Sequence, residues 1–161
     1  MKAILKTKML KTALLSLSIL TSVTALAAVE KIGSFDIIMS PTQAFQNNGA
    51  ALKPIQDQDD FVFNHENESY AVVAKRADGT VATVVRQPSD MNPGKYFYMG
   101  YFFNCKQKMD IPMTFEDEKE LTDILKSAPS TFAAQTKQDQ SAQNIDDSMG
   151  VHDLYLLSCQ K

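Results

Sequence analysis

The two histidines, His65 and His152, are the side chains best suited to acid–base chemistry near neutral pH. A hydrolase of the Ser-His-acid type would need a nucleophile and an acid around one of them. The chain has no Gly-x-Ser-x-Gly motif that would mark such a serine. His65 lies between Asn64 and Glu66, where we expect a turn and a solvated side chain. The sequence therefore predicts a protein that is not an enzyme, and a small hydrolase is the least favoured function.

Three acids close together have the chemistry of calcium ligands. Asp57, Asp59 and Asp60 form an acidic segment. An EF-hand would need a third acid at the position of Phe61 and a glycine directly after it, and neither is present. We interpret the segment as a solvated acidic loop, and the sequence predicts no metal site and no cofactor.

The two cysteines, Cys105 and Cys159, form the most definite pair of reactive side chains. In an oxidising compartment two cysteines of a small domain usually pair. Such a bond would close a loop of about 55 residues and stabilise the fold by about 4 kcal/mol. A redox role is less favoured because the chain has no Cys-x-x-Cys motif. Free or intermolecular thiols are the alternative to a structural disulfide.

Residues 1–27 have the three parts of a cleavable signal peptide. Four lysines and no acid occupy the first eleven residues, an apolar stretch follows over 13–20, and Ala25-Leu26-Ala27 ends the segment. The apolar stretch is too short for a stable membrane span, which needs ~20 apolar residues, so an uncleaved anchor is the less favoured alternative. We expect residues 28–161 to form one mature domain in the periplasm, at the cell surface or outside the cell.

Charge restricts the partners of that mature domain. Without the four lysines of the leader, the 16 basic residues fall to 12 against 19 acidic residues, so the net charge is near −7. An acidic surface repels phosphate backbones, and no basic run opposes this effect. We therefore expect no nucleic acid partner, and a protein partner is favoured.

The clearest local pattern is a β-hairpin. Residues 70–76 and 80–86 are rich in strand-forming residues and flank Asp78-Gly79, a dipeptide that accepts the positive φ angles of a tight turn. Two shorter strands are expected at 35–39 and 61–63. The polar stretch 42–60 between them is interpreted as a loop with room for a turn of helix.

An aromatic strand follows the turn Asn92-Pro93-Gly94 and covers residues 95–105. Alternate residues face opposite sides, so one face carries Phe97, Met99, Tyr101, Phe103 and Cys105, and the other carries Tyr96, Tyr98, Gly100 and Phe102. Two apolar faces are typical of a central strand covered on both sides. Tyr96, Tyr98 and Phe102 either pack in the core or, where no helix covers them, form an aromatic patch suited to protein recognition.

The last third of the chain predicts helical structure. Residues 114–126 have a capping residue in Thr114, acids in the first turn and an apolar stripe, as in a helix on a sheet. Residues 130–144 are interpreted as a flexible connector, and 151–159 as an apolar tail that is either a strand or a short helix. The predicted fold is α+β, a small antiparallel sheet of about four to six strands with one or two helices on a face and one disulfide.

The strand ending at Cys105, followed by Lys106, together with the terminal element Leu154–Cys159, resembles the surface-adhesin protein E family of Gram-negative bacteria. The resemblance covers mainly residues 61–108 and the tail. It implies a signal peptide and a small antiparallel sheet, with the strand cysteine tethered to a C-terminal element that lies over the sheet. It also implies adhesion to extracellular proteins of a host.

Two functions fit these features. The first is an exported, adhesin-like protein-binding module that uses the aromatic strand. The second is a periplasmic inhibitor or immunity protein, whose acidic surface would face a basic secreted enzyme or toxin. The sequence does not decide between them, and oligomeric state is open.

Overall fold

The computed structural model describes residues 29–46, 51–56, 65–147 and 151–160. The predicted signal peptide, the predicted strand at 61–63 and the acidic segment 57–60 lie outside these ranges. The strands are β1 (Lys31–Ile32), β2 (Phe35–Ile37), β3 (Lys53–Pro54), β4 (Ser69–Lys75), β5 (Thr80–Pro88), β6 (Tyr96–Asn104), β7 (Met109–Thr114) and β8 (Gln143–Asn144). The helices are α1 (Pro41–Phe45), α2 (Glu118–Ser127), α3 (Phe132–Gln138), the short 3-10 helix η2 (Ile145–Asp147) and α4 (His152–Cys159).

All strands belong to one antiparallel sheet in the order β1-β2-β4-β5-β6-β7-β8, with β3 also paired to β4. The predicted α+β class with one disulfide is confirmed. The described sheet has eight strands rather than four to six. The difference comes mainly from β1, β3 and β8, which are two residues long and too short to leave a periodic pattern in the sequence.

The predicted hairpin around Asp78-Gly79 is formed by β4 and β5. The backbone N–H of Arg76 donates to Thr80 O at 2.8 Å, which closes the turn. Gly79 has a φ of +90°, in the region that favours glycine. The dipeptide therefore sets the register of the two strands, as its turn chemistry predicts.

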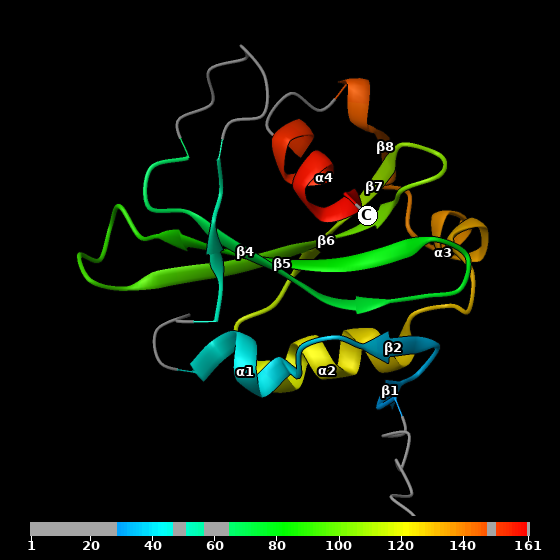
Figure 1. The fold of residues 1–161 in the computed structure, drawn as a ribbon, viewed down its shortest axis with the longest axis horizontal. Coiled ribbons are helices and arrows are strands. Elements are labelled where there is room, and N and C mark those ends of the chain that lie inside the picture. The colour runs from blue at the N-terminus through cyan, green and yellow to red at the C-terminus, as the bar shows by residue number, and fades with distance from the viewer. Residues whose placement is uncertain (1–28, 47–50, 57–64, 148–150, 161) are drawn as a thin grey trace, which may run out of the picture.

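Strand β6 lies between β5 and β7 and is covered on both faces, as predicted for a central strand. In Figure 1 helices α1 and α2 lie below the sheet and α4 lies above it. Phe102 packs in the cluster that includes Leu121 and Leu125 of α2. Phe103 packs on the opposite face, in the cluster that includes Leu154 and Tyr155 of α4. The sheet is therefore the middle layer of three.

Helix α2 confirms the helix predicted at 114–126, with a later start. Asp117 is its N-cap and accepts a hydrogen bond from the backbone N–H of Glu120 at 2.8 Å. Thr114 instead ends β7, where it pairs with Met99 of β6, so the strand takes the residues before the cap. Within the described ranges, no helix combines the length and the apolarity that a membrane crossing requires.

The interpretation of residues 130–144 as a flexible connector is wrong, because this segment contains α3 and β8. Thr131 caps α3, and Phe132 is buried in the core below the sheet. Although Ala, Gln and Ser dominate the segment, the buried Phe132 and the capping Thr131 contribute to docking it.

A buried polar network holds α3 against the β4–β5 hairpin. The Arg76 guanidinium donates to the Pro129 carbonyl oxygen and to Thr80 Oγ1, and its Nε lies 3.1 Å from Asp78 Oδ1. Asp78 also accepts from the backbone N–H of Phe132 at 2.7 Å. Burial alone would raise the pKa of Asp78, but the hydrogen bonds outweigh it and lower this pKa to about 2. The carboxylate is therefore ionised at neutral pH.

The tail is a helix, α4, which settles the alternative between strand and helix. Cys105 and Cys159 form the predicted disulfide, with their Cα atoms 5.5 Å apart. Beside it, the Tyr155 hydroxyl donates to the Cys105 carbonyl oxygen at 3.3 Å, and the rings of Phe103 and Tyr155 meet edge to face. The covalent bond therefore holds an eight-residue helix on the upper face of the sheet.

Replacement of Cys105 by serine should destabilise the domain markedly. The disulfide closes a loop across a sequence separation of 54 residues, and the chain-entropy model assigns such a loop about 4 kcal/mol of stabilisation. Urea unfolding of the oxidised domain and of Cys105→Ser measures the difference. Wild-type protein kept reduced should match the variant, and equal midpoints for oxidised and reduced protein would contradict the role given to this bond.

Candidate functional site

The hairpin of β5 and β6 is longer than the strands beside it. β5 and β6 pair along nine residue pairs. β4 follows β5 only as far as Arg86, and β7 follows β6 only as far as Met99. The end of the hairpin, residues 87–98, therefore projects beyond the rest of the sheet, at the left of Figure 1. This two-stranded segment is called the arm below.

The predicted turn Asn92-Pro93-Gly94 lies at the tip of the arm. The Ser89 hydroxyl accepts from the backbone N–H of Asn92 at 3.0 Å, and the backbone N–H of Lys95 donates to Asn92 O at 2.9 Å. Gly94 has a φ of +80°. These local hydrogen bonds close the tip without help from other elements, so the arm keeps its shape while it projects.

The base of the arm is anchored by ring contacts. Tyr98 packs against Phe45 of α1, with ring centroids 4.4 Å apart. The Arg86 guanidinium lies over the ring of Tyr96, 4.3 Å from its centroid. On the arm's β5 strand the Gln87 amide donates to Glu68 Oε1 at 2.7 Å. The arm is thus anchored at its base, whereas its tip projects from the sheet.

Apolar side chains on the arm are exposed. Met91 is 82% exposed, Phe97 50% and Tyr96 39%. Only two other large apolar side chains of the described residues, Val29 and Ile38, are exposed. Three of the five exposed large apolar side chains therefore lie on one projecting hairpin. Burial of this apolar surface by a partner would be energetically favourable.

A cleft of about 460 Å³ lies beneath the arm, next to the start of α2. It is lined by Tyr96, Phe97, Tyr98, Thr114, Phe115, Glu116 and Glu120. Phe115 is buried, whereas the two glutamates are exposed. The cleft therefore combines aromatic rings with two carboxylates at the surface, and it is called the aromatic cleft below.

Of the three residues predicted as a binding patch, the structure brings two together. Tyr96 and Tyr98 both line the aromatic cleft. Phe102 does not join them, because it is only 3% exposed and stacks on Phe35 at 5.4 Å under the helices of the lower face. Phe97 belongs to the surface and was missed, since sequence alternation placed it on the face under the tail. Phe97 is exposed because it lies in the part of β6 that extends beyond β7. No pattern in the sequence indicates where β7 and α4 end, so this exposure could not be predicted.

His65 is not a solvated turn residue, contrary to expectation. Its side chain is mostly buried, with Nδ1 2.8 Å from Glu68 Oε2 and Nε2 3.4 Å from Asp153 Oδ2 of α4. Asp153, which follows His152 in the sequence, therefore faces His65. Both ring nitrogens of His65 face carboxylates, whereas the histidine of a Ser-His-acid site directs one nitrogen to the serine. The arrangement ties the segment before β4 to α4.

Asp110 is a buried acid on β7, only 2% exposed. Within the described part of the chain its Oδ1 has no hydrogen-bond partner. Burial raises the pKa of this carboxyl to about 6. Burial, and then the nearby charges of Asp110 and Glu68, also raise the pKa of Tyr101. Asp110 is thus a group whose charge changes just below neutral pH, inside the domain.

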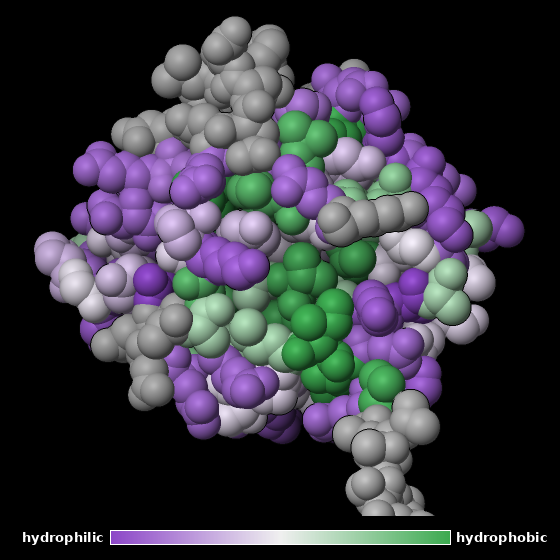
Figure 2. All heavy atoms as spheres, viewed as in Figure 1, coloured by the Kyte–Doolittle hydropathy of each residue, from purple (hydrophilic) through white to green (hydrophobic). Residues whose placement is uncertain are grey.

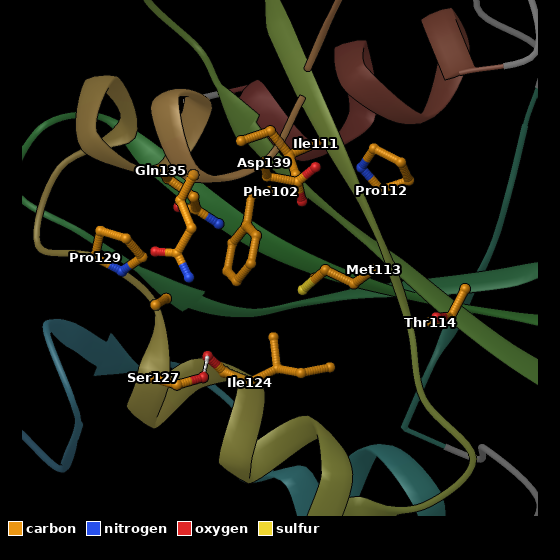
Figure 3. A pocket seen from close by; sticks show the side chains of 12 residues that line it. Phe102, Ile111, Pro112, Met113, Thr114, Ile124, Ser127, Pro129, Gln135 and Asp139 are labelled. Atoms are coloured by element: carbon orange, nitrogen blue, oxygen red, sulfur yellow. Dashed lines mark hydrogen bonds between the residues drawn. The ribbon is translucent and has the colours of Figure 1, made fainter. Parts of the chain in front are cut away.

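Two further clefts are lined by residues outside the arm. One, of about 310 Å³, lies between β7, α2 and α3, and Figure 3 shows its lining. Its polar side chains already serve the fold, because Gln135 Oε1 accepts from Arg76 and the Asp139 carboxylate accepts from Ser141.

The other cleft, of about 570 Å³, includes Ile38, Met39, Val81 and Leu157 in its lining. Figure 2 shows an apolar band that runs from the middle of the molecule towards its lower right, below the position of α4 in Figure 1. Ala51 also lines this cleft. Among the described residues, no group of three or more His, Cys, Asp or Glu is placed to hold a metal ion.

Comparison of the chain with protein-family models, with curated proteins and with solved structures gave no match. The resemblance to the surface-adhesin protein E family therefore stays a prediction from the layout of Cys105 and Cys159.

Replacement of Asp110 by asparagine should stabilise the domain at neutral pH. A folded-state pKa of about 6 exceeds the ordinary 3.8. The stability that the protonated carboxyl contributes is therefore fully present below pH ~4 and is lost as the pH rises through about 6. An asparagine side chain at this position stays neutral, so the variant should gain on the order of 2 kcal/mol at pH 7.5 and almost nothing at pH 4.

Urea unfolding at both pH values measures this difference, and Asp90→Asn, at an exposed position, is the control that should change little. An Asp110→Asn variant less stable than wild type at pH 7.5 would show that the carboxylate is needed in its charged form.

Proposed function

We propose that the chain is an exported, non-enzymatic protein-binding module and that the arm is its contact surface. The observation that carries this proposal is the exposure of Met91, Tyr96 and Phe97 on one projecting hairpin. Each of these side chains would be stabilised by about 25 cal/mol for every Å² of apolar surface that a partner removes from water.

A protein is a better partner for the arm than a small molecule. Tyrosine and other aromatic side chains supply large contact areas at low conformational cost, and they are frequent among the residues that dominate interface energies. A projecting hairpin fixed at its base by Tyr98 and Phe45 can enter a groove of a partner without reordering. Small ligands favour enclosed cavities instead, and the aromatic cleft is open and lies at the surface.

Export is supported by the disulfide between Cys105 and Cys159, since such bonds persist in oxidising compartments. It is also supported by the signal-peptide pattern of residues 1–27. We place the mature domain in the periplasm, at the cell surface or outside the cell. Its net charge near −7 favours a protein partner over a nucleic acid.

A non-enzymatic role is supported by the surroundings of His65. The carboxylates of Glu68 and Asp153 hold both ring nitrogens of His65, which suits a structural tie better than proton exchange with a substrate.

Two classes of partner fit the arm. An adhesin-like role, with an extracellular host protein as partner, follows from the resemblance to the surface-adhesin protein E family. A role as inhibitor or immunity protein is favoured by a separate observation, the carboxylates of Glu116 and Glu120 beside the exposed rings, because they would complement a basic enzyme or toxin.

Site-specific cross-linking tests the proposal directly. A photo-reactive phenylalanine analogue at position 97, in cells that produce the protein, should give one major cross-linked product with another protein. The same analogue at Ala133, which is exposed on α3 far from the arm, is the matched control and should give none. With the captured partner purified, Phe97→Ser should weaken binding about 30-fold, the effect of losing an aromatic anchor worth roughly 2 kcal/mol.

Equal cross-linking from positions 97 and 133, or none from position 97, would contradict a binding role for the arm. An affinity left unchanged by Phe97→Ser would do the same. Circular dichroism of the variant checks that the fold is intact, which the exposed position of Phe97 predicts.

A further inference from the structure

The aromatic cleft has two chemically distinct parts. Its inner wall is apolar, formed by the half-buried ring of Tyr98 and the buried ring of Phe115. Its outer side carries the exposed carboxylates of Glu116 and Glu120. An occupant that complements both parts needs an apolar stem and a positively charged end.

The carboxylates of the cleft are not neutralised by salt bridges within the described part of the chain. The lysines of α2 are directed elsewhere, since Lys119 and Lys126 both lie within 4.0 Å of the Asp123 carboxylate. Glu116 and Glu120 make no ion pair with a described residue. Glu120 Oε2 accepts from the backbone N–H of Glu116 at 2.7 Å, which keeps this side chain beside the cleft. A cation that enters would therefore meet two carboxylates that form no ion pair with a described lysine.

The rings of the arm already accept one cation within the molecule. The Arg86 guanidinium lies 4.3 Å from the centroid of Tyr96, a distance suited to a cation–ring interaction. Arg86 is not part of the lining of the cleft. Tyr96 thus shows how a guanidinium packs on this hairpin, while both carboxylates of the cleft are left for a second cation.

We propose that the aromatic cleft binds a lysine or arginine side chain from a basic segment of the partner protein, which deepens the proposed function and rests on it. The stem of the side chain packs along Tyr98 and Phe115, and its charged end reaches Glu116 and Glu120. The charge of the mature domain, near −7, attracts the same kind of segment over a longer range. The arm supplies contact area, and the cleft selects for positive charge.

A peptide titration followed by NMR tests the selectivity of the cleft. The probe is an acetylated, amidated Gly-Lys-Gly-Lys-Gly peptide, and the comparison peptide has glutamate in place of both lysines. The lysine peptide should shift the ring resonances of Tyr96, Tyr98 and Phe115, and the glutamate peptide should leave them unchanged. Added salt should weaken the shifts, because the attraction is partly between exposed charges.

Matched variants separate the cleft from general acidity. The double variant Glu116→Gln and Glu120→Gln keeps the shape of both side chains and removes their charge, so it should weaken the lysine peptide about fivefold, as expected for roughly 1 kcal/mol. Glu118→Gln removes a charge from the same turn of α2 but lies outside the lining of the cleft, so it should change binding little.

Equal shifts with both peptides, or equal weakening by Glu118→Gln and the double variant, would overturn the inference. The outcomes are distinguishable from those of the cross-linking test. If position 97 captures a partner whose binding is unaffected by the double variant, the arm keeps its role and the cleft loses the one proposed for it. If the peptide binds in the cleft but position 97 captures no partner, the protein-binding function itself fails.

Discussion

Strand β6 is apolar on both faces, and the arrangement of the other elements follows from the need to cover it. Helices α1 and α2 cover one face and α4 covers the other, so each of these elements is packed by its contacts with the sheet. Gly100 lies where β6 is closely packed, since a Cβ there would lie 2.6 Å from the Thr83 carbonyl oxygen and 2.9 Å from a methyl group of Met113. Towards the start of β6, pairing with β7 ends at Met99 and the pairing of β5 with β4 ends at Arg86, and the rest of the hairpin becomes the arm. The same strand therefore provides the core at one end and the candidate binding surface at the other.

A domain of this size relies on a few strong ties where apolar area is small. Helix α4 has eight residues and no side-chain cap at Val151, so it would be marginal alone, and the disulfide to Cys105 keeps it in place. Helix α3 is shorter still and is held by Asp78 and the buried Arg76. Both ties join elements distant in the sequence to the β4–β5–β6 meander. Neither the disulfide nor the Arg76–Asp78 network contacts the arm directly, but the base of the arm depends on the rigid sheet that they stabilise.

Local chemistry explains what could be predicted from the sequence. The Asp78-Gly79 turn, the two-faced strand around Gly100 and the apolar stripe of α2 are signals carried by neighbouring residues, and each was confirmed. The cysteine pair was predictable because only two cysteines exist. Features that depend on contacts between distant segments could not be inferred. These are the two-residue strands, the docking of α3 by Phe132, the contact of His65 with Asp153, the burial of Phe102 and the exposure of Phe97. The candidate site was therefore half predicted: its strand and two tyrosines were found, but the limits of the strands beside it were not.

The central claim is that the arm is exposed to solvent in the isolated domain and is buried by a partner protein in the cell. Hydroxyl-radical footprinting compares these two states without requiring the identity of the partner. Met91, Tyr96 and Phe97 should be oxidised readily in the purified domain and protected in intact cells. Ile38 is also exposed but lies outside the arm, and it serves as the internal reference that should be oxidised similarly in both samples. Equal oxidation of the three arm residues in cells and in the purified domain would contradict the account.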